Sequence, residues 1–114
     1  MANTFKLKTK ASLTTSLAAV YTVPSSKTAI ILSISLANKT GNSVTASVQI
    51  SSDTSDTETN ADAYLLSTAP VPSGGTLEVM QGNKLVLQTT DVLKAKASTG
   101  SAVDIIVSLM EMDV

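Results

Sequence analysis

The chain has 114 residues, enough for one domain with one hydrophobic core but not for two. Its formal net charge is −1, which argues against nucleic acid or an anionic membrane as a partner, since both require clustered positive charge. Histidine, cysteine, tryptophan and arginine are absent, which removes the commonest general base, all thiol chemistry and the bidentate guanidinium group. We therefore expect a non-enzymatic protein without a metal or other cofactor.

The N-terminal segment 1–12 is the first predicted strand. Apolar and basic side chains alternate along it, with Phe5 and Leu7 on one face and Lys6, Lys8 and Lys10 on the other. Neighbouring lysines on such a strand stand about 7 Å apart. The row is either an edge strand guarded by charge, or an arm that adds a strand to a neighbouring subunit. In the first case the lysines discourage unwanted strand pairing. In the second, Phe5, Lys6, Lys8 and Lys10 lie at a protein interface.

Serine and threonine interrupt the stretch ASLTTSLAAVYTV, which follows these lysines. It therefore lacks the continuous apolar region of a secretory signal. No apolar run approaches the roughly 18 residues of a membrane helix. We expect neither a signal peptide nor a membrane partner.

The clearest pattern is a hairpin formed by residues 29–37 and 44–51. Period-two alternation predicts one core face and one wet face. The expected core-facing residues are Ile30, Leu32, Ile34 and Leu36 in the first strand and Val44, Ala46, Val48 and Ile50 in the second. The turn between them contains Asn38, Gly41 and Asn42, which suit positive φ angles and local side-chain hydrogen bonds.

The segment 51–62 is polar and acidic and has no apolar anchor, so it predicts a mobile loop. Its carboxylates are Asp53, Asp56, Glu58 and Asp62. Carboxylate oxygens can bind calcium, but this spacing lacks the order of a dedicated calcium loop. A solvated loop, facing water or a neighbouring subunit, explains the segment without a metal.

Three more strands are expected at residues 85–88, 92–98 and 102–112. Lys94 and Lys96 point outward from the second of them. In the third, a core face is formed by Val103, Ile105, Val107 and Leu109. Met110 and Met112 lie on the opposite face, so either both faces are covered within the fold or a partner covers one. Methionine suits adaptable contacts, and we assign these two residues to a protein interface. About eight short strands predict an antiparallel β-sandwich or jelly roll that occupies residues 1–114 as one domain.

One short motif raises an alternative to a binding role. Ser25 and Ser26 precede Lys27, and some hydrolases use a serine nucleophile with a lysine base. Serine is abundant in this chain, and VPSSKT is explained more simply as a turn that leads into a strand.

The stretches YTVPSSKTAIILSISLANKTGNSVTASVQI, AYLLSTAPVPSGGTLEV and GNKLVLQTTDVLKAKASTGSAVDIIVSLMEM follow one another from Tyr21 to Met112. In the order of their turns and strands they resemble small all-β virion structural proteins of tailed bacteriophages, especially cyanophages. The resemblance covers nearly the whole chain and consists of scaffold features, so it carries over no catalytic residue. It implies a structural module that decorates a capsid or forms part of a neck, tail or fibre.

We therefore expect a capsid decoration, or cement, protein that binds and stabilises the shell of the major capsid protein. It would be made in the host cytoplasm, reside in the virion and form a homo-oligomer or bind other virion proteins. A neck, tail or fibre component is the first alternative. A glycan-binding module for host recognition is the second, although the chain has little aromatic surface for stacking sugars. A small hydrolase is the third.

Overall fold

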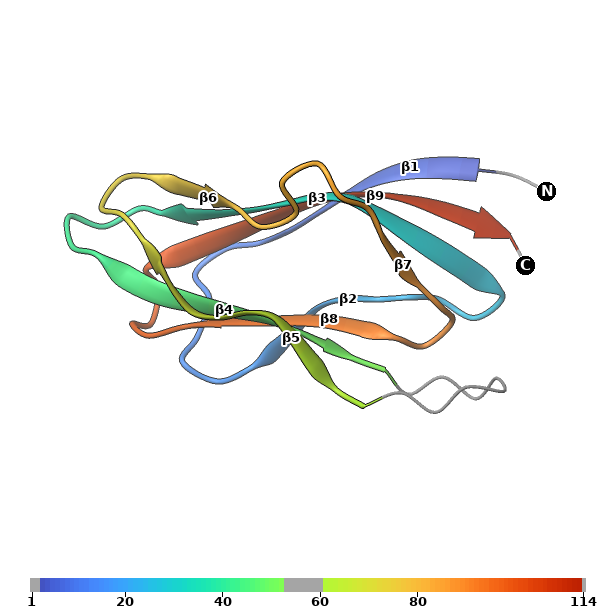
Figure 1. The fold of residues 1–114 in the computed structure, drawn as a ribbon, viewed down its shortest axis with the longest axis horizontal. Coiled ribbons are helices and arrows are strands. Elements are labelled where there is room, and N and C mark those ends of the chain that lie inside the picture. The colour runs from blue at the N-terminus through green and yellow to red at the C-terminus, as the bar shows by residue number, and fades with distance from the viewer. Residues whose placement is uncertain (1–2, 53–60, 114) are drawn as a thin grey trace.

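Two antiparallel sheets pack face to face around one hydrophobic core (Figure 1). The structure is a computed structural model that describes residues 3–52 and 61–113. The described strands are β1 (Asn3–Lys10), β2 (Ala18–Thr22), β3 (Lys27–Asn38), β4 (Val44–Ser51), β5 (Ala63–Val71), β6 (Thr76–Glu78), β7 (Leu85–Leu87), β8 (Val92–Ala97) and β9 (Val103–Asp113). The all-β sandwich fold predicted from the alternation is confirmed, with nine strands rather than about eight.

The first sheet has the order β1-β9-β3-β6, and β7 also pairs with β3. The second has the order β2-β8-β4-β5. Strands that are distant in the chain become neighbours, because β1 pairs with β9 over its full length, from Asn3 opposite Met112 to Lys10 opposite Ile105. Within the described residues there is no helix with the length and apolarity to cross a membrane.

The core forms because alternate residues of both sheets are apolar and face each other. In β9 these are the four residues expected from the pattern, and all are almost fully buried: Val103, Ile105, Val107 and Leu109. Opposite them, β8 contributes the buried residues Leu93, Ala95 and Ala97 and leaves Lys94 and Lys96 on its outer face. The expected orientation of these two strands is confirmed.

A β-bulge in β3 changes which residues of the long hairpin face the core. Ile31 lies opposite Leu109 of β9, and Ser33 lies opposite the adjacent Ser108, so two steps along β3 match one step along β9. Leu32 is therefore an extra residue without a partner in the ladder, and it shifts the alternation by one position. The buried residues of β3 are Ala29 and Ile31 before the bulge and Ile34, Leu36 and Asn38 after it.

The expectation that Ile30 and Leu32 face the core is therefore wrong. Both are only half-buried. Apolar residues occupy every even position from Ile30 to Leu36, and Ile31 is apolar as well, so the sequence alone leaves the phase of residues 30–32 open. The bulge turns Ile31 inward before it and Ile34 and Leu36 inward after it. The expected mobile loop at 51–62 lies mostly outside the described residues.

The turn between β3 and β4 depends on side-chain hydrogen bonds. The buried amide of Asn38 donates to the Asn42 carbonyl at 2.7 Å and to the Val71 carbonyl at 3.0 Å, and its oxygen accepts the Thr40 backbone N–H at 2.9 Å. This confirms the expected local bonding. The expected positive φ angles are not found, because Asn38, Gly41 and Asn42 are absent from the positive-φ residues.

The backbone conformations of two glycines predict opposite effects on stability when each is replaced by alanine. Gly41 has open space around its Cβ position and no positive φ, so Gly41→Ala should be neutral or stabilise the protein by about 0.5 kcal/mol. Gly82 has a φ of +86°, where an alanine is strained, so Gly82→Ala should destabilise it by about 1 kcal/mol. Urea unfolding of both variants measures the difference, and an equal loss at both positions would contradict the turn geometry.

Candidate protein interface

An apolar row runs across the outer face of the first sheet, the face that points away from the core. In the register, Phe5 of β1 lies opposite Met110 of β9, which lies opposite Ile30 of β3, which lies opposite Val86 of β7. Directly opposed residues share a face, so these four side chains form one continuous line across four strands. Phe5 is 73% exposed and Val86 is 59% exposed. We call this line the apolar row.

The surroundings of the apolar row are small and largely uncharged. Leu7 and Ile106 add two more exposed apolar side chains on the same face of β1 and β9. Between them the register places hydroxyl groups, including those of Ser108 and Ser33. The lysines of β1 and β3 occupy the alternate positions, so these strands place no lysine on this face. The carboxylates on this face, those of Glu78 and Asp104, lie opposite Ser35 and Ala37, away from the apolar row. A largely apolar face of this kind is typical of a protein contact.

The six residues assigned to an interface divide into two groups. Phe5, Met110 and Met112 lie on the outer face, and Met112 is opposite Asn3, two positions from the apolar row. The three lysines lie on the other face of β1, with Lys6, Lys8 and Lys10 opposite the buried residues Leu109, Val107 and Ile105. The segment 3–10 is an edge strand paired with its own β9, and its apolar side chains, not its lysines, point away from the core.

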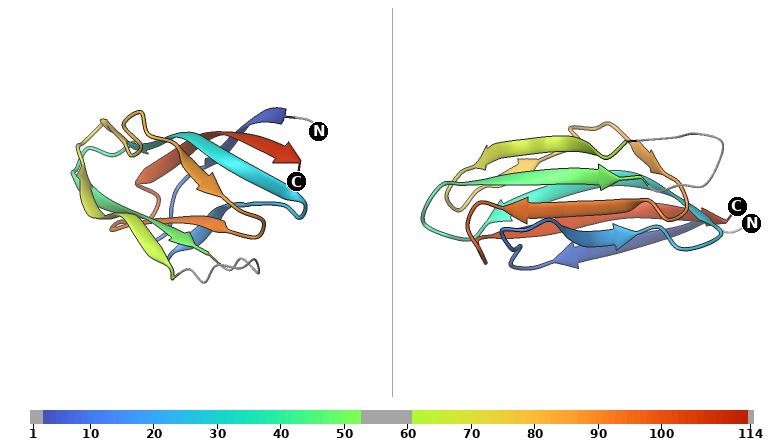
Figure 2. Two further views of the ribbon diagram at one scale, coloured as in Figure 1. Left: turned by 45° about the vertical axis from the view of Figure 1, so that its right-hand side comes forward. Right: turned by 90° about the horizontal axis from the view of Figure 1, so that it is seen from below.

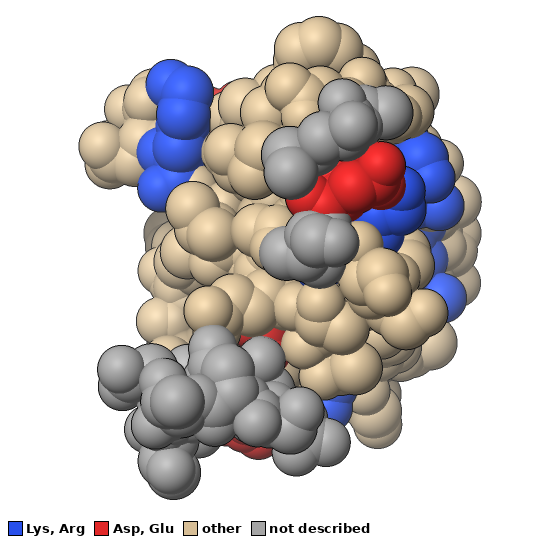
Figure 3. Space-filling view, turned by 90° about the vertical axis from the view of Figure 1, so that its right-hand side faces the viewer, with Lys and Arg blue, Asp and Glu red and all other residues tan. Residues whose placement is uncertain are grey.

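Lys6 belongs to a charged cluster at the end of the sandwich where β1, β2 and β9 meet. The carboxylate of Glu111 is 3% exposed. It accepts a hydrogen bond from the Tyr21 hydroxyl at 2.6 Å and forms an ion pair with the Lys6 Nζ at 2.9 Å. Lys27 and Asp113 form a second ion pair between β3 and β9. Figure 3 looks onto this end of the molecule and shows acidic and lysine atoms side by side.

The electrostatics of this cluster favour a structural role. The hydrogen bond from Tyr21 and the nearby Lys6 hold the pKa of Glu111 below its ordinary value, although burial opposes this. Burial, with the hydrogen bond to Glu111, raises the pKa of Tyr21 far above its ordinary range. The hydrogen bond to Asp113 raises the pKa of Lys27. A lysine or tyrosine that serves as a base at neutral pH needs the opposite shift, so neither residue is prepared for that role.

Glu111 and Tyr21 were not expected from the sequence to act together. One signal was available, because Glu111 continues the inward positions of β9 after Leu109. A carboxylate on a core face requires a partner. The identity of that partner depends on β2 and β9 meeting in the fold, and Tyr21 is 90 residues away along the chain.

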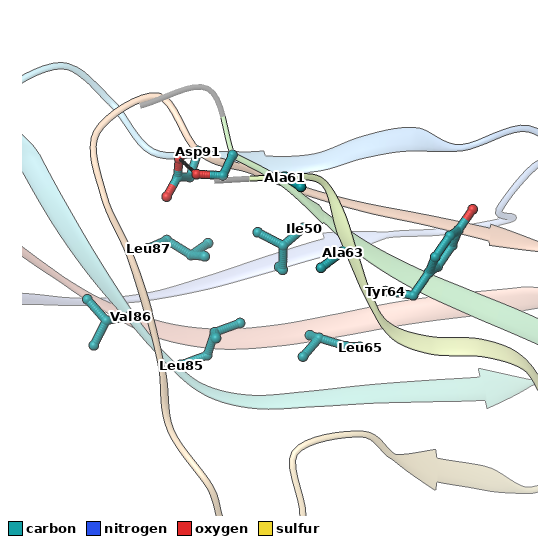
Figure 4. Close-up of a pocket in the computed structure, with 10 residues that line it drawn as sticks. Ile50, Ala61, Ala63, Tyr64, Leu65, Leu85, Val86, Leu87 and Asp91 are labelled. Carbon is teal, nitrogen blue, oxygen red and sulfur yellow. Dashed lines mark hydrogen bonds between the residues drawn. The ribbon is translucent and has the colours of Figure 1, made fainter. Parts of the chain in front are cut away.

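A groove of about 310 Å³ opens at the sandwich edge opposite β1, between β5 and β7. Figure 4 shows its apolar side chains, with Asp91 toward one end and Tyr64 toward the other. The apolar lining consists of Ile50, Ala61, Ala63, Leu65, Leu85, Val86 and Leu87. Asp91 is 5% exposed and accepts hydrogen bonds from the Ser52 hydroxyl and the Gln88 N–H. Across the described ranges, no three acidic residues gather in a way that could hold a metal ion.

Comparisons with known proteins show a likeness of fold to a solved structure. No family model matches the chain, and no curated protein matches it. A solved structure of Bacillus endospore appendages, described as a novel family of disulfide-linked pili, aligns with a TM-score of 0.51 and 12% identity. The alignment covers 99% of this chain and 88% of that one. The chain contains no cysteine, so it can form no disulfide of its own.

Proposed function

We propose that this protein is a structural subunit of a repeated protein assembly and that it contacts its neighbours through the outer face of the first sheet. The observation that carries this proposal is the apolar row, which exposes Phe5 and Val86 at its two ends. Exposing such side chains to water is unfavourable, and a protein surface that covers them gains roughly 25 cal/mol for each Å² of apolar area removed from water.

The particular assembly that we propose is a tailed-bacteriophage virion, in which the protein decorates the capsid and stabilises the major capsid protein shell. The sequence resemblance to small all-β virion proteins supports this form. The fold likeness to a pilus protein is compatible with a subunit role but not specific for a capsid. A face with few charges suits many identical contacts on a symmetric shell, where weak contacts add up.

Incorporation into particles tests the role of the outer face. Met110→Lys places a charge in the middle of the apolar row and should lower the amount of protein on particles by about tenfold or more, because the lysine would lose its hydration at the contact. Ala19→Lys is the matched control, since Ala19 is exposed on the second sheet. Immunogold electron microscopy and mass spectrometry of purified particles measure the amount and the position.

Each outcome of this experiment has a definite meaning. Wild-type label spread over the heads supports capsid decoration, whereas label on the neck or tail supports the alternative location. Equal incorporation of Met110→Lys and wild type would contradict the outer face as the contact. Absence of the wild-type protein from particles would contradict the virion function.

A further inference from the structure

The exposed large apolar side chains gather at the two opposite edges of the sandwich, which the apolar row connects across the outer face of the first sheet. Phe5, Leu7 and Ile106 lie on β1 and the neighbouring β9. The remaining three line the groove between β5 and β7: Tyr64, Leu65 and Val86. The right-hand view of Figure 2 shows β1 along one edge of the molecule and β5 and β7 along the other.

The two edges also differ in charge in a complementary way. Lys8 and Lys10 of β1 form no ion pair within the described part of the chain. At the opposite edge, the carboxylate of Asp91 lies almost buried beside the groove. It accepts hydrogen bonds, and none of the lysines in residues 3–52 and 61–113 lies within ion-pair distance of it. A buried carboxylate gains from a nearby cation. One edge therefore offers apolar and cationic side chains on one strand, and the other offers an apolar groove with a carboxylate.

We infer that the β5–β7 groove receives the β1 edge of a second copy of this chain, so that copies join head to tail. Phe5 and Leu7 of the second copy would cover the apolar groove, and its unpaired lysines would lie near Asp91. This inference rests on the proposed function in treating the chain as a subunit, and it identifies a partner and the two surfaces that meet.

A symmetric contact between two β1 edges is less favourable. Antiparallel pairing of β1 with a second β1 would bring two lysine rows to the same face, where like charges on opposed strands destabilise the pair. It would also leave both grooves uncovered. Joining unlike edges covers one groove for every β1 edge, and repetition of that contact produces either a closed ring or an open filament.

Complementary variants distinguish the two kinds of contact. Phe5→Asp damages the β1 edge and leaves the groove intact, whereas Leu65→Asp damages the groove and leaves the β1 edge intact. Both side chains are exposed, so the fold should persist, which circular dichroism and thermal melting check. Sedimentation velocity of wild type, each variant and their equimolar mixture measures assembly, with Ala19→Asp as the control.

We expect wild type and Ala19→Asp to form species larger than a dimer, and each edge variant alone to remain monomeric. The mixture should form dimers of one copy of each variant, joined through the two undamaged edges. Normal assembly of Leu65→Asp, a mixture that stays monomeric, or a wild type that is monomeric at its highest soluble concentration would each overturn the inference. The proposed virion function is judged separately, by the presence of wild type on particles.

Discussion

Replacing Ile31 by alanine is expected to lower the free energy of unfolding by about 2–5 kcal/mol, the usual range for truncating a fully buried isoleucine. Ile31 is 0% exposed and lies opposite Leu109 in the first sheet. The loss combines the transfer of the removed carbon atoms with the cavity that the rigid sandwich core would retain. Urea denaturation, followed by far-ultraviolet circular dichroism, gives this free energy.

The adjacent Ile30 provides a matched control, because it has the same side chain on the other face of the same strand. It is half-buried, so Ile30→Ala should cost only about 1 kcal/mol. The ordering of the two variants tests the bulge at Leu32. If Ile30→Ala were the more damaging of the two, the register of β3 before the bulge would be incorrect.

Removing the carboxylate of Glu111 is expected to have the second large effect. In Glu111→Ala the buried hydroxyl of Tyr21 loses its acceptor and Lys6 loses its ion pair. A hydrogen bond to a charged group contributes roughly 1.5–3 kcal/mol, and an unsatisfied buried donor costs a similar amount. We expect the protein to lose about 3 kcal/mol of stability, with most of the loss arising from Tyr21, because the Lys6 side chain is 40% exposed.

The stabilisation by Glu111 should depend on pH in one particular direction. Because the pKa of Glu111 is lower in the folded chain than its ordinary value of 4.5, its stabilising contribution is complete above that value. It is lost as the pH falls through the lowered pKa of the folded state. The stability difference between wild type and Glu111→Gln should therefore be largest near neutral pH and should shrink in acid.

Tyr21→Phe is the control for the cluster. It keeps the aromatic ring in the core and removes only the hydroxyl that donates to Glu111 at 2.6 Å. If Tyr21→Phe and Glu111→Gln act on the same hydrogen bond, their combination should cost less than the sum of the two separate losses. A fully additive double variant, or a stability difference that stays constant between neutral and acidic pH, would contradict the coupling.

Part of the candidate interface could be predicted from the chain alone. Met110 and Met112 share a face because side chains alternate along a strand, which is a local property. Phe5 joins them on that face only because β1 pairs with β9 in one particular register. Ile30 and Val86 complete the apolar row only because β9, β3 and β7 pair in one particular register. The groove likewise depends on β5 and β7 lying at the same edge of the sandwich.

The sequence by itself determined the fold class and the orientation of the regular strands. Alternating apolar residues with few charges specify strands, and β8 and β9 present the faces that their patterns indicate. Only the tertiary structure decided the bulge at Leu32, the outward direction of Phe5 and the meeting of Tyr21 with Glu111. The physical reason is that alternation is set between neighbours in the chain, whereas phase, register and partners are set by packing between segments that are far apart in sequence.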